Sequence, residues 1–155
     1  MTFADIVAAL SKEVGTEIET DSDTCAVRTD ASNKASVTVL MHGFDSREAL
    51  LMTADLGVPP PERLERLYRS LLEANDLFRD TGGATLSIEG ATGRVRIQRF
   101  DTYDALKDVG PYQALIAFAT VATAWAGIVR DFRDAPAAKN ESEEQDFSNL
   151  SGFRV

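Results

Sequence analysis

The sequence predicts an α+β domain in the order α-β-β-β-α-β-β-α, with an antiparallel sheet and helices packed on it. Apolar residues recur at helical spacing near the start, in the middle and near the end of the chain, which predicts three helices. Between these segments apolar and polar residues alternate, as in half-buried strands. The period changes at Gly82 and Gly83, so the middle helix is expected to turn directly into a hairpin. The length of 155 residues suits one domain with a sizeable core.

The first helix is predicted from Phe3 to Val14. Thr2 suits an N-cap, Asp5 three residues later completes a capping box, and Gly15 ends the helix. One face carries an apolar stripe that predicts burial, formed by Phe3, Ile6, Val7, Leu10 and Val14. The stripe is broad enough to join the core and also to contribute to a binding surface.

Three strands are predicted next, over residues 25–29, 35–42 and 48–56, with polar turns between them. The second and third strands are apolar on one side, through Val37, Val39, Met41, Leu50, Met52, Ala54 and Leu56. Leu40 and Leu51 lie on the opposite face, which is therefore not wholly polar. Apolar side chains on that face are candidates for contact with a partner.

The prolines at positions 59–61 stop the sheet and begin a second helix, because proline is tolerated in a first helical turn. The apolar side of this helix has two possible neighbours, the sheet of its own subunit or the same helix of a second subunit. After the turn at Gly82 and Gly83, which needs the backbone freedom of glycine, residues 84–89 and 94–100 alternate in polarity. They predict a β-hairpin with its turn at residues 90–93.

The last helix is predicted over Pro111–Phe132 and carries the strongest burial signal in the chain. Residues 114–129 contain no charge, but these 16 residues fall short of the roughly 20 that a membrane span needs. We therefore expect a helix that is buried against the sheet, and no membrane insertion.

Beyond this helix the composition changes, so we expect a domain over residues 1–133 and a separate C-terminal tail. Residues 134–155 hold five acids and two bases, which predicts a solvated, flexible segment. The alternative is that Phe147, Leu150 and Phe153, which follow the acids, anchor the tail in a groove of its own or a neighbouring subunit.

Composition and charge exclude several classes of function. The formal net charge of −9 opposes the phosphate backbone and anionic membrane surfaces, so no nucleic-acid partner is expected. Cys25 is the single cysteine, and the N-terminus lacks the basic and long apolar regions of a signal peptide. A cytoplasmic location is expected.

No catalytic or metal motif is evident in the sequence. His42 and Cys25 are the only residues of their kinds, so a zinc ligand set is missing, and there is no G-x-S-x-G elbow. Arg94, Arg96 and Arg99 alternate along a predicted strand, which is typical of a solvated face. We expect no enzymatic activity, no cofactor and no metal.

The junction between the second helix and the hairpin carries a specific motif. It consists of Leu72, Ala74, Asn75, Leu77 and Phe78, then the string TGGATLS at residues 81–87, then Gly93 and Val95. This long, gapped string resembles the class I type III secretion chaperones, also called the Tir chaperone family. Asp76 departs from the family pattern, in which Asn runs directly into Leu-Phe, and the extra residue predicts a bulge or a longer helix end.

The resemblance implies a bacterial cytoplasmic protein that does no chemistry. Such a protein holds an extended segment of a secreted effector, keeps it soluble and helps to present it to the secretion ATPase. An alternative from another class is a protein-interaction or regulatory module of the same fold that is not tied to secretion.

The resemblance also implies surfaces for a second subunit and for a client. Family members dimerise largely through the second helix, so the candidates for a homodimer interface are Leu64, Leu67, Tyr68 and Leu71. The candidates for client contact are Phe3, Val7, Leu10, Leu40 and Leu51.

Overall fold

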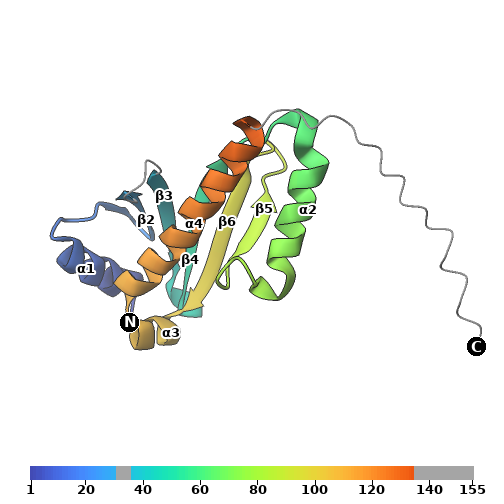
Figure 1. Ribbon diagram of the computed structural model, residues 1–155. Coiled ribbons are helices and arrows are strands. Elements are labelled where there is room, and N and C mark those ends of the chain that lie inside the picture. The colour runs from blue at the N-terminus through green and yellow to red at the C-terminus, as the bar shows by residue number, and fades with distance from the viewer. Residues whose placement is uncertain (31–35, 135–155) are drawn as a thin grey trace, which may run out of the picture.

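The computed structural model describes residues 1–30 and 36–134 as an α+β fold (Figure 1). Within these residues, six antiparallel strands form one sheet in the order β1-β2-β3-β4-β6-β5. The strands are β1 (Thr20–Asp21), β2 (Thr24–Asp30), β3 (Ser36–Phe44), β4 (Ala49–Gly57), β5 (Thr85–Ile88) and β6 (Val95–Thr102). The helices are α1 (Phe3–Val14), α2 (Leu64–Asn75), α3 (Tyr103–Val109) and α4 (Pro111–Asp134). Short 3-10 turns are η1 (Asp45–Arg47), η2 (Pro61–Arg63) and η3 (Asp76–Phe78).

The predicted α+β fold class and element order are confirmed, with two short additions. Strand β1 has two residues and α3 has seven, so neither is long enough to show a hydrophobic period. The acidic segment of residues 134–155 lies outside the described residues from position 135 on, and α4 itself continues to Asp134.

Helix α1 begins and ends as the sequence predicts. The Thr2 hydroxyl accepts the N–H of Asp5 at 3.2 Å, and the Asp5 carboxylate accepts the N–H of Thr2 at 2.7 Å. The backbone N–H of Thr2, followed by its hydroxyl, holds the pKa of Asp5 below its usual value. Gly15 caps the C-terminus at φ 73°, in the left-handed region that glycine enters without strain.

Helices cover one face of the sheet, and α4 runs across it in front of β4 and β6 (Figure 1). Helix α1 lies against α4 and β3, while α2 lies against β5 at the far edge. Most apolar strand residues on this covered face are buried; Val39, Met41 and Met52 have no exposed surface. The core therefore lies between the sheet and α4.

Helix α1 approaches β3 so closely that one position admits only glycine. A Cβ atom at Gly43 would lie 2.5 Å from the Cβ and Cγ atoms of Phe3, which is closer than side chains come in folded proteins. The missing side chain of Gly43 thus makes room for the ring of Phe3, which is 3% exposed.

Helix α4 has the length and composition of either a membrane span or a core helix. In this fold its apolar side chains are packed on the sheet, with Leu115, Phe118, Ala122, Trp125 and Val129 buried. The Trp125 indole donates to the Asp80 carbonyl oxygen at 3.0 Å, which ties α4 to the loop that follows α2. The prediction of a helix buried against the sheet is confirmed.

The junction after α2 is irregular, as the extra residue Asp76 predicts. Helix α2 ends at Asn75, and Leu77 and Phe78 adopt φ angles of 52° and 53°. The Asn75 side chain accepts the N–H of Leu86 at 2.9 Å and donates to the carbonyl oxygen of Leu86 at 3.0 Å. A single amide group therefore fixes the helix end to β5.

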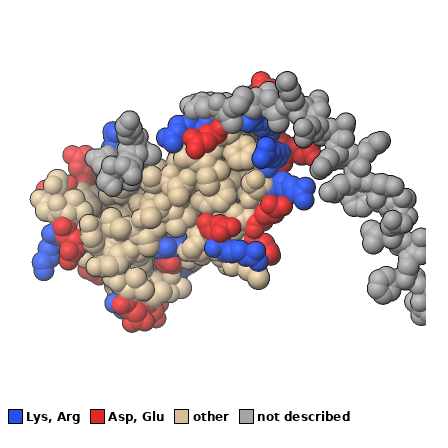
Figure 2. All heavy atoms as spheres, in the orientation of Figure 1, with Lys and Arg blue, Asp and Glu red and all other residues tan. Residues whose placement is uncertain are grey.

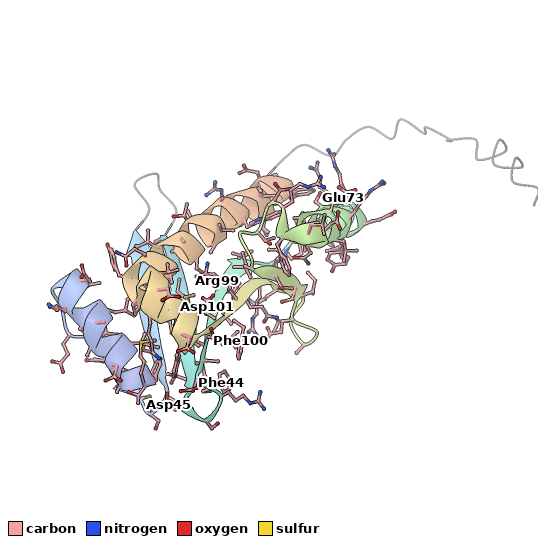
Figure 3. The ribbon with its side chains drawn as sticks, turned by 90° about the horizontal axis from the view of Figure 1, so that it is seen from below. Phe44, Asp45, Glu73, Arg99, Phe100 and Asp101 are labelled. Atoms are coloured by element: carbon pink, nitrogen blue, oxygen red, sulfur yellow. The ribbon has the colours of Figure 1, made fainter. Side chains whose placement is uncertain are left out.

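Asp45 joins three separate elements at one end of the sheet (Figure 3). Its carboxylate accepts the N–H of Phe3 at 2.8 Å and the hydroxyl of Tyr103 at 2.6 Å. Burial, together with this bond to Asp45, raises the pKa of Tyr103 far above its ordinary value. The start of α1, the η1 turn and the start of α3 are thereby held together.

Candidate functional site

The sheet face opposite α4 carries a cluster of apolar and aromatic side chains that no described helix covers. We call it the open-face patch; its residues are Leu40, His42, Phe44, Leu51 and Phe100. Leu40 is 50% exposed and Phe100 is 55% exposed. In Figure 3, Phe44 and Phe100 lie on the side of the sheet away from α4, whereas Arg99 and Asp101 lie toward it.

Strand register brings these side chains together. His42 of β3 is opposite Leu51 of β4, and Leu51 is in turn opposite Phe100 of β6. Ring centroids are 4.4 Å apart for His42 and Phe44, and 6.1 Å apart for Phe44 and Phe100. Residues on one face of a sheet alternate with those on the other, so β3 and β4 are apolar on both faces. The arrangement suits contact with apolar side chains of another chain.

A second feature lies at the β2 edge of the same sheet. Strand β1 pairs only with Thr24 and Cys25, so in the described part of the chain the outer edge of β2 is unpaired from Ala26 onward. Beside this edge is a hollow of about 420 Å³, which we call the β2-edge groove. Its lining is Val14, Thr16, Glu17, Ile18, Glu19, Ala26, Val27 and Arg28. An extended segment can add backbone hydrogen bonds at such an edge and place side chains in the groove.

A third surface lies on α2 and in the turn that follows it. Leu72 is 71% exposed, Leu77 is 81% exposed and Phe78 is 53% exposed. We call these three residues the α2 outer patch. The left-handed backbone of Leu77 and Phe78 turns these two side chains toward solvent at a cost in conformational energy.

The structure divides the predicted client-contact residues into two groups. Phe3, Val7 and Leu10 are 3%, 7% and 0% exposed, because the α1 stripe packs into the core of its own chain. A client cannot reach them without a rearrangement of the fold, so we leave them out of the binding surface. Leu40 and Leu51 do lie together, on the open-face patch.

The structure divides the predicted dimer residues in the same way. Leu67 and Leu71 are 0% and 4% exposed and belong to the core of their own chain, where α2 packs on β5, whereas Leu64 and Tyr68 are half-buried. The sequence left open whether the apolar side of α2 packs on the sheet of its own subunit or on a second subunit. Leu67 and Leu71 pack on the sheet of their own subunit.

Sequence reasoning missed several members of the open-face patch and of the α2 outer patch. Phe44 and Phe100 belong to the open-face patch, and Leu72, Leu77 and Phe78 form the α2 outer patch. The available signal for the second patch was the spacing of Leu64, Tyr68 and Leu72, which places a second apolar row beside the buried one.

Metal binding and thiol chemistry are both disfavoured in the part of the chain that the structure describes. No group of three or more His, Cys, Asp or Glu among them could hold a metal ion. Cys25 is buried, and its burial raises the pKa of its thiol, which disfavours the reactive thiolate.

The predicted row of arginines is paired with acids. Arg94 pairs with Asp55, Arg96 with Glu89 at 2.6 Å and Arg99 with Asp101 at 2.9 Å. Figure 2 likewise shows basic and acidic side chains next to one another on the visible face. Burial alone would raise the pKa of Asp55, but the bonds from Arg94 and the Gly57 N–H outweigh it and lower that pKa. The arginines therefore form local ion pairs and not an anion-binding surface.

Comparison with solved structures finds proteins of the same fold. Solved structures that resemble the chain include the ExsC–ExsE complex, at 18% identity and a TM-score of 0.58, covering 87% of this chain and 94% of the other. The ExoU–SpcU complex of the Pseudomonas aeruginosa type III secretion system matches at 16% identity and a TM-score of 0.61, covering 84% and 99%. The HopA1–SchA chaperone–effector complex matches at 16% identity and a TM-score of 0.57, covering 83% and 94%.

The family assignment comes from the sequence comparison. No curated protein matches the chain. The model of the Tir chaperone protein (CesT) family matches residues 5–105, which is about two thirds of the chain and includes the open-face patch, the β2-edge groove and α2. The chain belongs to the Tir chaperone protein (CesT) family.

Proposed function

We propose that this protein is a type III secretion chaperone, which binds an extended segment of a secreted effector in the bacterial cytoplasm and keeps it soluble for secretion. Family membership is the observation that carries the proposal. The similar solved structures support it, since they are complexes of a chaperone with an effector or of the type III secretion system. In this role the protein does no chemistry and needs no cofactor, and the secretion ATPase is its expected downstream partner.

The client surface in this proposal is the open-face patch together with the β2-edge groove. Covering Leu40 and Phe100, each about half exposed, contributes on the order of 1 kcal/mol for each side chain. Strand addition at β2 supplies backbone hydrogen bonds that depend little on client sequence. Apolar patches then select the client, and the sheet edge holds it extended.

The proposal includes a homodimer formed through the outer side of α2. Leu64 and Tyr68 are half-buried, Leu72 one turn further along the helix is exposed, and Leu77 and Phe78 of the turn that follows are exposed as well. A row of apolar side chains along one helix, continued by two more in its C-terminal turn, suits a self-complementary two-fold interface. Leu72→Glu should give a folded monomer, because the side chain makes few contacts within its own chain. Arg69→Glu, on the same helix and outside the patch, is the control; a folded Leu72→Glu dimer would place the interface elsewhere.

The client proposal is tested by co-purification of the tagged protein from its native cytoplasm, followed by mass spectrometry and limited proteolysis of the complex. We expect one dominant secreted protein, protected over an extended segment. Leu40→Thr combined with Phe100→Thr should weaken that complex roughly tenfold to thirtyfold, by loss of the two apolar contacts. Val109→Thr is the matched control, because Val109 is 60% exposed on α3, which packs on the other side of the sheet.

Two results would contradict this function. A folded partner without a protected segment, bound equally by the double variant, would indicate the protein-interaction or regulatory module considered from the sequence. A clean homodimer without any partner in cells that secrete effectors would do the same.

A further inference from the structure

The start of α2 and the end of α4 lie side by side (Figure 1) and enclose a small pocket. We call it the α2–α4 pocket; it is lined by Arg63, Arg66, Ile128, Asp131 and Phe132. Its volume of about 270 Å³ is just below the range of about 300–1,000 Å³ that is usual for small-molecule sites. A pocket of this size suits one or two side chains of a peptide better than a whole ligand.

The lining of the pocket indicates the chemistry of its occupant. Ile128 is 38% exposed and Phe132 is half-buried, so the α4 side offers apolar surface. Two arginines stand on the α2 side, and the described residues place no acidic partner on Arg66. Asp131, the one acid among the described lining residues, lies 3.5 Å from Arg130 of its own helix. A peptide segment with acidic residues next to a bulky apolar side chain would complement the arginines on the α2 side and the apolar surface on the α4 side.

The chain itself contains such a segment, and it follows α4. Residues 141–146 include Glu141, Glu143, Glu144 and Asp146, and Phe147 comes directly after them. We propose that residues 141–147 bind in the α2–α4 pocket of their own subunit. In this arrangement Phe147 contacts Ile128 and Phe132, and the acidic side chains face Arg63 and Arg66. This proposal does not depend on the chaperone function.

The length of the connecting chain permits this contact. Phe147 is 13 residues beyond Asp134, and a flexible linker of that length spans roughly 18–22 Å on average. Ile128 is six residues before Asp134, or about 9 Å along the helix. A short linker gives the segment an effective concentration on the order of millimolar, so contacts that are weak between separate molecules are populated within one chain.

The test uses NMR of the full-length protein, with backbone amide signals of residues 141–150 as the readout at about 50 mM NaCl. At low salt the ion pairs are weakly screened, so the bound form should be populated. Arg66→Glu should lower the ratio of bound to free tail about fivefold to tenfold and move these signals toward disordered positions. Arg69→Glu should leave the signals in place, because Arg69 lies on the same helix, pairs with Glu73 and does not line the pocket.

A second pair of variants changes only the tail, so that it remains informative if Arg66→Glu disturbs the fold. Phe147→Ser should release the tail, whereas Phe153→Ser should leave it bound. The proposal is overturned if the wild-type tail signals already lie at disordered positions at low salt, or if Arg66→Glu and Phe147→Ser leave bound-tail signals unchanged.

Binding to another subunit is distinguished by mixing. Labelled Arg66→Glu protein is combined with an excess of unlabelled wild-type protein. We expect the labelled tail to stay free, since its own pocket is altered. Recovery of the bound signals in the mixture would show that the tail occupies a second copy of the chain, which contradicts binding within one subunit.

Discussion

The two faces of the sheet are built from the same strands, but helices bury one face and leave the other exposed. On the covered face, Val39, Met41 and Met52 are wholly buried by α1 and α4. On the other face, Leu40 and Phe100 remain about half exposed. An ordinary antiparallel sheet with one solvated face has polar residues there. Apolar residues on both faces therefore separate two tasks: one face stabilises the fold, and the other is available for a partner.

The sharpest test of this comparison uses two phenylalanines. Phe118 of α4 is 1% exposed, and Phe118→Ala should lower the free energy of unfolding by about 3–5 kcal/mol through lost burial and a cavity. Phe100→Thr should lower it by at most about 1 kcal/mol, since it removes mainly a cross-strand contact. Urea denaturation measures both. Similar losses in the two variants would contradict the division of tasks.

The second prediction concerns the hydrogen bond between Tyr103 and Asp45, which holds α3 to the η1 turn at one end of the sheet. Tyr103→Phe removes the hydrogen bond to Asp45, and we expect a loss of about 1.5–3 kcal/mol at pH 7 because the acceptor is charged. The raised pKa means that this stabilisation is fully present below about pH 10 and is lost as the pH rises further. Denaturation at pH 7 and pH 11 should therefore show a smaller alkaline loss in Tyr103→Phe than in the wild type.

The third prediction concerns the capping box of α1, the helix that packs against β3. Thr2→Ala removes the hydroxyl that accepts the N–H of Asp5, and a loss of about 1 kcal/mol is expected. The lowered pKa of Asp5 adds a pH dependence: its contribution is present above about pH 4 and is lost as the pH falls through the lowered value. Asp5→Asn should remove this acid dependence. An unchanged acid transition would show that the capping box contributes little.

The smallest expected change in stability is at Leu40. Leu40→Thr places a β-branched residue, which favours the strand conformation, at a half-exposed position of β3, so the free energy of unfolding should change by less than about 0.5 kcal/mol. Client affinity should nevertheless fall, roughly fivefold, because half of a leucine side chain is no longer covered in the complex. Titration of the purified client by calorimetry gives the affinity. Loss of stability without loss of affinity would reverse the assignment of the two faces.

The fold was predictable from the sequence because its signals are local. The α1 cap at Thr2 and Asp5, the alternation in β3 and β4, and the glycines at positions 82 and 83 all report on neighbouring residues. The α2 to β5 junction was recognisable from a motif and its one departure, Asp76.

The surfaces were less predictable because they depend on distant pairing. The helical stripe through Leu67 and Leu71 shows that these residues are buried, but it does not show by which neighbour. Phe100 joins Leu51 only through the register between β4 and β6, which are separated in sequence by α2 and the hairpin turn. Local periodicity carries no information on that register, so Phe100 was not found. Phe44 was not found because the predicted strand ended at residue 42, whereas β3 continues to Phe44.

The close contact between α1 and β3 has an evolutionary consequence. Gly43 has no room for a Cβ atom while Phe3 occupies its present position, so the two positions are not free to diverge separately. Among relatives, a larger residue at position 43 should occur only together with a smaller one at position 3. The same compensation should be measurable as positive epistasis, in which Phe3→Ala, which removes the Cγ and Cδ2 atoms nearest to Gly43, harms the native protein but partly rescues Gly43→Ala.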